Sequence, residues 1–210
     1  MNHPSANFLI QRLIFLARWP QTEMILESIK RDFGFTANNA HGTRALQCLL
    51  DELGRHQSKK MSEKSSQLLA QGLNTCVLEL ACNVRGNHVI KKCLNLMTNE
   101  THKQEVYEAV LGMNPNPQFL QISKDQHGCQ VIQECIRTAS LKNKLKLMQP
   151  VKHYLTELIN DEFGNYVVQG ILEPNGHNVK WKKQKEAQQW LKSTQWLFDY
   201  IGENMGGLCK

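Results

Sequence analysis

Five short clusters of side chains that can form hydrogen bonds or stack recur along this chain of 210 residues. In one of them, Gln169 follows Asn165 by four residues, and Tyr166 stands between the two. Side-chain amides carry both hydrogen-bond donors and acceptors, which suit the edge of a nucleobase. A flat side chain such as tyrosine can stack on the face of a base. These residue types therefore favour the recognition of one base by each cluster.

Each cluster occupies positions i, i+1 and i+4, and we call it a triplet. On a helix, the third side chain of a triplet neighbours the other two, so the three form one polar group. The third residue is glutamine in four triplets, and the middle residue is planar in four, which is more than an inert solvent-exposed face requires. The predicted base-edge residues are Asn7, Gln11, Thr43, Gln47, Asn87, Lys91, Cys129, Gln133, Asn165 and Gln169. The predicted stacking residues are Phe8, Arg44, His88, Gln130 and Tyr166.

The triplets belong to a longer repeat that predicts stacked helices. Successive triplets are 36, 44, 42 and 36 residues apart, which fits a unit of about 36 residues with insertions. Two apolar pairs follow each triplet start with helical phase, so they should face a common core. Three residues before the small residue that precedes each of the last four triplets, the chain has an Asn or Asp whose oxygen can accept an N–H group at a helix start. These residues are Asn39, Asn83, Asp125 and Asp161, and the first unit has His3 at this position. No sustained alternation of period two occurs, and the sequence therefore predicts an all-α fold.

Between the triplets lie further helix-like stretches and two basic insertions, and a partial repeat follows the last triplet. Apolar, helix-like stretches cover residues 46–53, 68–80, 105–111, 141–148 and 151–159. Polar, basic insertions at 54–67 and 174–189 are expected to be solvated loops or helix extensions, with added RNA contacts as the alternative. Residues 190–210 resemble a partial further repeat. Residues 1–210 are thus predicted to form a single array, which lacks polar caps and is either part of a longer domain or naturally short.

Composition restricts the function. A net charge of +6 and a pI near 8.9 suit a polyanionic partner. The seven cysteines include no pair at zinc-ligand spacing, which favours reduced, buried thiols and predicts no metal or cofactor. Residues 8–17, the most apolar N-terminal stretch, are interrupted by Gln11 and Arg12, so no membrane segment is expected. Motifs of hydrolases, nucleotide-binding enzymes and metalloproteases are absent, so no catalytic residue and no enzyme activity are predicted.

At the triplets, the sequence resembles the Pumilio (PUF) family of RNA-binding proteins, from residue 7 to about residue 209. The resemblance implies a right-handed α-solenoid of three-helix repeats that binds single-stranded RNA. It also implies that the first and third residues of a triplet contact the base edge, and that the middle residue stacks between bases. The order of the triplets is similar to the second to sixth repeats of an eight-repeat PUF domain.

The resemblance also implies base preferences. Asn-aromatic-Gln triplets are associated with uracil, and Cys-Arg-Gln or Ser-Arg-Gln triplets with adenine. Because the family binds RNA antiparallel to the protein, the expected core is 5′-U-(A or other)-U-A-U-3′. Three triplets depart from the pattern: Thr43 replaces the cysteine or serine of the adenine type, Gln130 replaces the usual stacking residue, and Lys91 replaces glutamine. Lys91 has two interpretations, a contact to a phosphate or base oxygen or a unit that no longer recognises a base.

These observations predict a monomeric, cytoplasmic protein that binds mRNA 3′ untranslated regions and regulates translation or mRNA stability. Regulatory proteins are expected on the convex face. Two alternatives stay open at this point. One is nucleolar RNA processing, as in divergent relatives, and the other is a protein-binding solenoid of the armadillo or HEAT type without base recognition.

Overall fold

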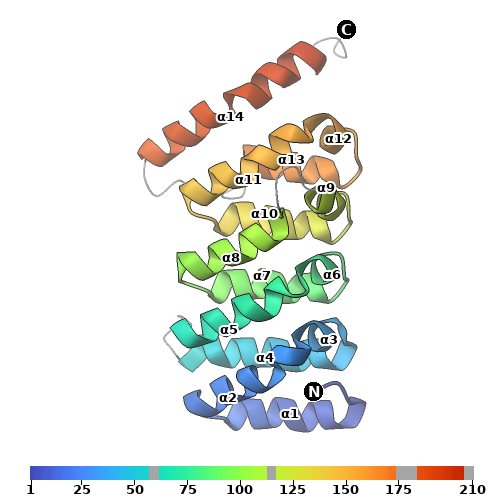
Figure 1. Cartoon of the computed structure of the whole chain (residues 1–210), viewed down its shortest axis with the longest axis vertical. Helices are drawn as coiled ribbons and strands as arrows, with labels where there is room; N and C mark the ends of the chain where they lie inside the picture. Colours follow the sequence, from blue (N-terminus) through green and yellow to red (C-terminus); the bar gives the residue numbers. More distant parts are fainter. Residues whose placement is uncertain (57–61, 113–116, 174–183, 206–210) are drawn as a thin grey trace.

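The computed structural model describes residues 1–56, 62–112, 117–173 and 184–205, and every element within these ranges is a helix. The helices stack in chain order along the long axis of the molecule, from the N-terminus at one end to α14 near the other (Figure 1). Three parallel rows of helices run along this axis. The predicted all-α stack of repeated units is therefore the observed architecture.

The first row carries the triplets, and we call it the triplet row. Each of its helices packs directly on the next, so successive triplets lie side by side along one face. Its members are α1 (Pro4–Leu16), α4 (Ala40–His56), α7 (Gly86–Leu96), α10 (Gly128–Thr138) and α13 (Gly164–Leu172).

The other two rows cover the triplet row from behind. The outer row is α2 (Trp19–Ile29), α5 (Glu63–Asn74), α8 (Glu100–Leu111), α11 (Leu141–His153) and α14 (Gln184–Met205). The short row is α3 (Phe33–Asn38), α6 (Val77–Ala81), α9 (Pro117–Ser123) and α12 (Leu155–Ile159), and a single 3-10 turn, Lys30–Asp32, precedes α3. Exposed ion pairs such as Lys64–Glu27 (3.1 Å) and Lys146–Glu108 (3.4 Å) bridge neighbouring outer helices and contribute little stability each.

The core lies between the rows and is filled by the apolar pairs that follow the triplets. In α4, α7 and α10 these pairs are fully or almost fully buried, for example Leu49 and Leu50 at 0% exposure. Burying one such leucine contributes about 1.5–3 kcal/mol, so the repeated pairs bind each unit to its neighbours.

The two ends of the array depart from this pattern. In α1, Leu9 and Leu13 are 62% and 50% exposed, and in α13 Leu172 is 39% exposed. Of the four apolar positions in each helix, Ile14 is buried in α1, whereas Val167, Val168 and Ile171 are all buried in α13. The departure is therefore larger in the first unit than in the last.

The structure corrects two of the helix-like stretches expected from the sequence. Residues 68–80 are not one helix, because the chain turns at Thr75 and Cys76 from the outer row into the short row. Residues 151–159 are likewise divided: α11 continues through Pro150 to His153, and α12 begins only at Leu155. Apolar spacing alone does not locate these turns, since the residues on both sides face the same core.

The two basic insertions lie largely at helix ends or outside the described residues. Residues 54–56 extend α4, residues 63–67 begin α5, and residues 57–61 are outside the described part. Residues 174–183 are also outside it, whereas residues 184–189 form the first turns of α14.

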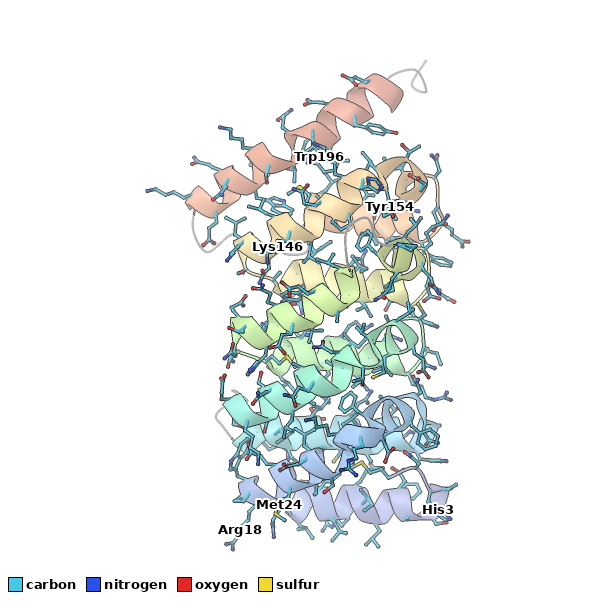
Figure 2. All side chains as sticks on the ribbon, viewed as in Figure 1. His3, Arg18, Met24, Lys146, Tyr154 and Trp196 are labelled. Atoms are coloured by element: carbon cyan, nitrogen blue, oxygen red, sulfur yellow. The ribbon has the colours of Figure 1, made fainter. Side chains whose placement is uncertain are left out.

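Helix α14 occupies the next place in the outer row, where residues 190–205 of the predicted partial repeat lie; residues 206–210 are outside the described part. Trp190 is 2% exposed and donates its indole N–H to the carbonyl of Ile171 at 3.1 Å. Trp196 faces α11 (Figure 2), where its Nε1 lies 3.4 Å from Sδ of Met148. These contacts fix α14 against the last complete unit.

Candidate nucleic-acid interface

A side-chain oxygen or nitrogen closes the first turn of every triplet helix. Asp125 Oδ1 accepts the backbone N–H groups of His127 and Gly128, both at 2.8 Å. Asn39, Asn83 and Asp161 make the same pair of bonds in their own units. His3, which differs in residue type, does the same through Nδ1 at 3.2 and 3.3 Å. The expected helix-start role is confirmed, and it extends to the histidine.

Burial alone would raise the pKa of Asp161, but the N–H groups of Gly164 and Phe163 and the ammonium of Lys124 lower it overall. Lys124 Nζ lies 3.3 Å from Asp161 Oδ2 and comes from the end of α9 in the preceding unit. The capping carboxylate of the fifth unit therefore also connects two units through its ion pair with Lys124.

The glycine before each of the last four triplets allows the triplet helix to approach the short helix of its own unit. A Cβ at Gly128 would lie 2.3 Å from the carbonyl oxygen of Ile122, and Gly42, Gly86 and Gly164 show similar conflicts with backbone six residues upstream. A backbone atom cannot move aside as a flexible side chain can. The small residue of the repeat is therefore a packing requirement.

Gly128→Ala should destabilise the protein by about 1–3 kcal/mol, because the added methyl group would displace the Ile122 backbone. A lower urea midpoint with an unchanged slope would show it. Gly202→Ala is the matched control, since a Cβ at this exposed helical position meets nothing within 4 Å. The control should be neutral or up to about 1 kcal/mol more stable, and equal midpoints for the two variants would contradict this packing account.

The first residues of the triplets are largely buried, and three of the five hydrogen-bond to the backbone one turn upstream. Asn87 Nδ2 and Asn165 Nδ2 each donate to the backbone carbonyl four residues upstream, at 2.8 and 2.9 Å. Thr43 Oγ1 lies 2.8 Å from the equivalent carbonyl and 2.5 Å from the carbonyl of Ala37. Asn7 is 0% exposed, and neither polar atom of its side chain has a protein partner. Thr43, which departs from the usual cysteine or serine, thus holds the same bond as the asparagines.

The middle residues project outward from the triplet row. All five are exposed, including the large aromatic side chains Phe8 (70%) and Tyr166 (47%). Burial lowers the pKa of His88, and the charges of Lys91 and His127 lower it further. Exposed flat side chains, one per unit, leave surface that a stacked base would cover.

The third residues lie between the buried first residues and the exposed middle ones, and several contact other triplet residues. Gln169 Nε2 donates to Asn165 Oδ1 within one triplet at 3.1 Å. Gln133 Nε2 donates to the backbone carbonyl of Tyr166 in the next unit at 2.6 Å. Lys91 Nζ donates to Gln130 Oε1, also in the next unit, at 2.9 Å. The last three triplets are therefore connected by hydrogen bonds.

A groove of about 740 Å³ opens on this surface where α7, α10 and α13 meet. Triplet residues from three units line it, among them Lys91, Gln133 and Tyr166. The triplet residues of α1 and α4 lie on the same row but outside the groove. The structure thus brings the last three triplets together in one concave site and continues the row beyond it.

Sequence reasoning missed part of the groove wall. Arg137 donates to Asn95 Oδ1 at 2.6 Å and to Glu134 Oε2 at 2.8 Å, and Asn95 also donates to Glu134. Arg137 and Glu134 line the groove, together with Phe163 and Glu173. Asn95 and Arg137 both stand eight residues after the first triplet residue, so extending the triplet phase by one turn would have found them.

The described residues offer little support for other kinds of site. None of their His, Cys, Asp and Glu side chains gather in groups of three or more that could hold a metal ion. The thiol of Cys129, which lines the groove, has a pKa raised by burial and is not a reactive thiolate. No helix in the described part is long and apolar enough to cross a bilayer.

Comparison with known proteins identifies the array. A family model described as the NOP9-like PUF repeat domain matches residues 9–197. A Pumilio domain-containing protein of Schizosaccharomyces pombe is 33% identical over 172 residues, which cover 82% of this chain and 23% of that protein. Pumilio homolog 12 of Arabidopsis thaliana is 29% identical over 176 residues, covering 82% of this chain and 27% of that protein. The chain therefore spans about a quarter of the length of these relatives.

Solved structures show the same fold. The RNA-binding domain of yeast Puf5p bound to MFA2 RNA has a TM-score of 0.73 and 25% identity, covering 96% of this chain and 50% of that one. The Puf4 RNA-binding domain bound to the HO endonuclease RNA 3′ UTR recognition sequence has a TM-score of 0.70 and 25% identity, covering 90% and 54%. The predicted right-handed solenoid of three-helix repeats is confirmed. The chain belongs to the Pumilio (PUF) repeat family and matches its NOP9-like repeat domain.

Proposed function

We propose that this chain binds single-stranded RNA along the triplet row and recognises one base with each triplet. The proposal rests on the regular spacing of the triplets along the row. Every unit presents an exposed middle side chain beside a hydrogen-bonding third one, on the face that opens into the groove. Stacked bases would cover the exposed rings, and their edges would meet the amides and Lys91. The RNA-bound PUF structures support the same mode of binding.

We propose a base order from the residue types of the triplets. Asn165-Tyr166-Gln169 and Asn7-Phe8-Gln11 would each recognise uracil, and Thr43-Arg44-Gln47 would recognise adenine. With the RNA antiparallel to the protein, the core is 5′-U-(A or other)-U-A-U-3′. The second base faces the Cys129 triplet, where Gln130 contacts Lys91, and the central base faces Asn87 and Lys91.

Binding of labelled RNAs that differ at one position tests this order. In a fluorescence polarisation titration, an RNA with the core 5′-UAUAU-3′ between cytidines should bind tightest. Replacing the first uracil by adenine should weaken binding by about 5- to 150-fold, which corresponds to one mismatched base. Equal affinity for all variants would remove the base assignments.

Two cellular roles fit such an activity. Regulation of mRNA through 3′ untranslated regions, in the cytoplasm, is the first candidate. The triplets at Asn7 and Asn165 keep the residue types of base-recognising PUF repeats, and the Thr43 triplet differs from them only at its first residue. Nucleolar RNA processing is the second, and the match to the NOP9-like repeat domain favours it. Crosslinking in cells followed by sequencing separates them: the bound RNA is enriched either in mRNA 3′ regions or in ribosomal RNA precursors.

The outer row would remain free for regulatory proteins in either role, since the RNA would occupy only the triplet face. We propose that the chain acts as a monomer and without catalysis. A protein-binding solenoid without RNA recognition remains the competing proposal, and the glutamine substitutions described in the Discussion distinguish the two.

A further inference from the structure

We propose that the third triplet recognises the keto oxygen of guanine or uracil and rejects the amino bases adenine and cytosine, with Lys91 as the residue that determines this specificity. The inference rests on the proposed function of the triplet row. It replaces the simple uracil assignment of this unit by recognition of a chemical group that two bases share.

The position of Lys91 favours a contact with a base edge over one with the RNA backbone. Its side chain is half-buried and lines the groove beside Cys129 and Gln130. Nζ donates to Gln130 Oε1 at 2.9 Å across the gap between α7 and α10. Burial lowers the pKa of Lys91, with a smaller opposing effect of Glu134. The ammonium therefore lies within the groove. Lys91 occupies the triplet position at which the other four units carry glutamine.

The chemistry of this ammonium differs from that of the glutamine it replaces. An amide can turn to present either a donor or an acceptor, whereas an ammonium has three donors and no acceptor. Gln130 takes one N–H, which leaves two for a base. Guanine O6 and uracil O4 are acceptors, but adenine and cytosine present an amino group at the corresponding place. Against Lys91, that amino group would have no acceptor, and its hydrogen-bonding capacity would be lost on binding.

Gln130 acts as a positioning residue in this account. Its amide oxygen orients the ammonium, although it lies 39 residues further along the chain. The middle side chain of the fourth triplet thus contacts the third residue of the third triplet. This contact gives Gln130 a role at a position where the other triplets carry an aromatic ring or an arginine.

The test uses four labelled RNAs with the core 5′-UANAU-3′, where the central nucleotide N is U, G, A or C. The central nucleotide faces the third of five triplets whichever way the RNA runs, so the result does not depend on polarity. The wild-type chain should bind the U and G forms with similar affinity, and the A and C forms at least about tenfold more weakly. Tighter binding of the A or C form than of the G form would overturn the inference.

Two substitutions assign the effect to one side chain. Lys91→Met removes the donors and keeps an unbranched side chain that is one atom shorter, and the four affinities should then agree within about threefold. Lys92→Met is the matched control, because the adjacent Lys92 makes its ion pair with Asp51 at 2.7 Å instead of contacting Gln130. The control removes the same charge and should preserve the order of the four RNAs.

The outcomes also separate this inference from the proposed function. A uniform loss of affinity in Lys91→Met, with a salt slope lower by about one, would mean a phosphate contact and would overturn the inference alone. Gln130→Ala should reduce the keto-to-amino ratio while leaving discrimination at the first nucleotide, opposite Asn165, unchanged. If no position of the RNA shows discrimination in the wild-type chain, the proposed function itself fails.

Discussion

Replacing Gln47, Gln133 and Gln169 together by alanine should weaken binding of the 5′-UAUAU-3′ RNA by at least about a hundredfold. On the proposed function, each glutamine would supply one hydrogen-bonding contact to a base edge, and each such contact would be worth about 1–3 kcal/mol. Three losses of about 1 kcal/mol already exceed a hundredfold change in Kd. Fluorescence polarisation measures the loss, and circular dichroism should show an unchanged helix content, since none of the three side chains is fully buried.

The matched control changes three glutamines that are exposed on the other two rows, Gln67 of α5, Gln121 of α9 and Gln149 of α11. This variant has the same composition and should bind RNA as the wild-type chain does. Wild-type affinity in the triplet-row variant would contradict base recognition and would favour the protein-binding solenoid.

The second large effect concerns stability. Leu49→Ala should lower the free energy of unfolding by about 2–5 kcal/mol, because this side chain is 0% exposed between stacked triplet helices and its removal leaves a cavity. Urea unfolding followed by circular dichroism measures the change. The loss should be accompanied by weaker RNA binding, since α4 carries its triplet between α1 and α7.

Leu13 provides the control for this substitution, because it holds the same repeat position in α1 but is 50% exposed. Leu13→Ala should cost about half as much as Leu49→Ala or less, because it buries about half of its area and its removal leaves no enclosed cavity. Equal losses for the two variants would contradict the core described above.

The sequence was sufficient to predict those parts of the fold that depend on local contacts. The residues that close each helix start act over two to three positions, and the repeat of Asn39, Asn83, Asp125 and Asp161 made them visible. The glycines also repeat, but only the structure shows that the backbone six residues upstream is what excludes a side chain there. The helical phase of the apolar pairs was enough to identify the core side of the central units.

The remainder depends on contacts between units, which the sequence pattern does not contain. Lys91 and Gln130 are 39 residues apart, and Asn95 and Arg137 are 42 residues apart. The third and fourth triplets are themselves 42 residues apart instead of 36, so the repeat length alone does not pair these residues. The exposure of Leu9 and Leu13 is likewise a property of an end unit and not of the residues. Apolar content also could not show that the chain turns at Thr75 between two rows, because both sides of the turn are buried.

The central claim is that each triplet specifies one base, and selection of bound sequences from a random RNA pool tests it most directly. The wild-type chain should enrich a uracil-rich motif with one fixed adenine. A variant with Asn165→Thr and Tyr166→Arg carries the triplet of the second unit in the fifth. Thr43 shows that threonine can keep the hydrogen bond to the carbonyl four residues upstream, so the helix should be preserved. This variant should enrich the same motif with adenine in place of uracil at the 5′ end only. No enrichment with the wild-type chain, or an identical motif from both proteins, would contradict the account.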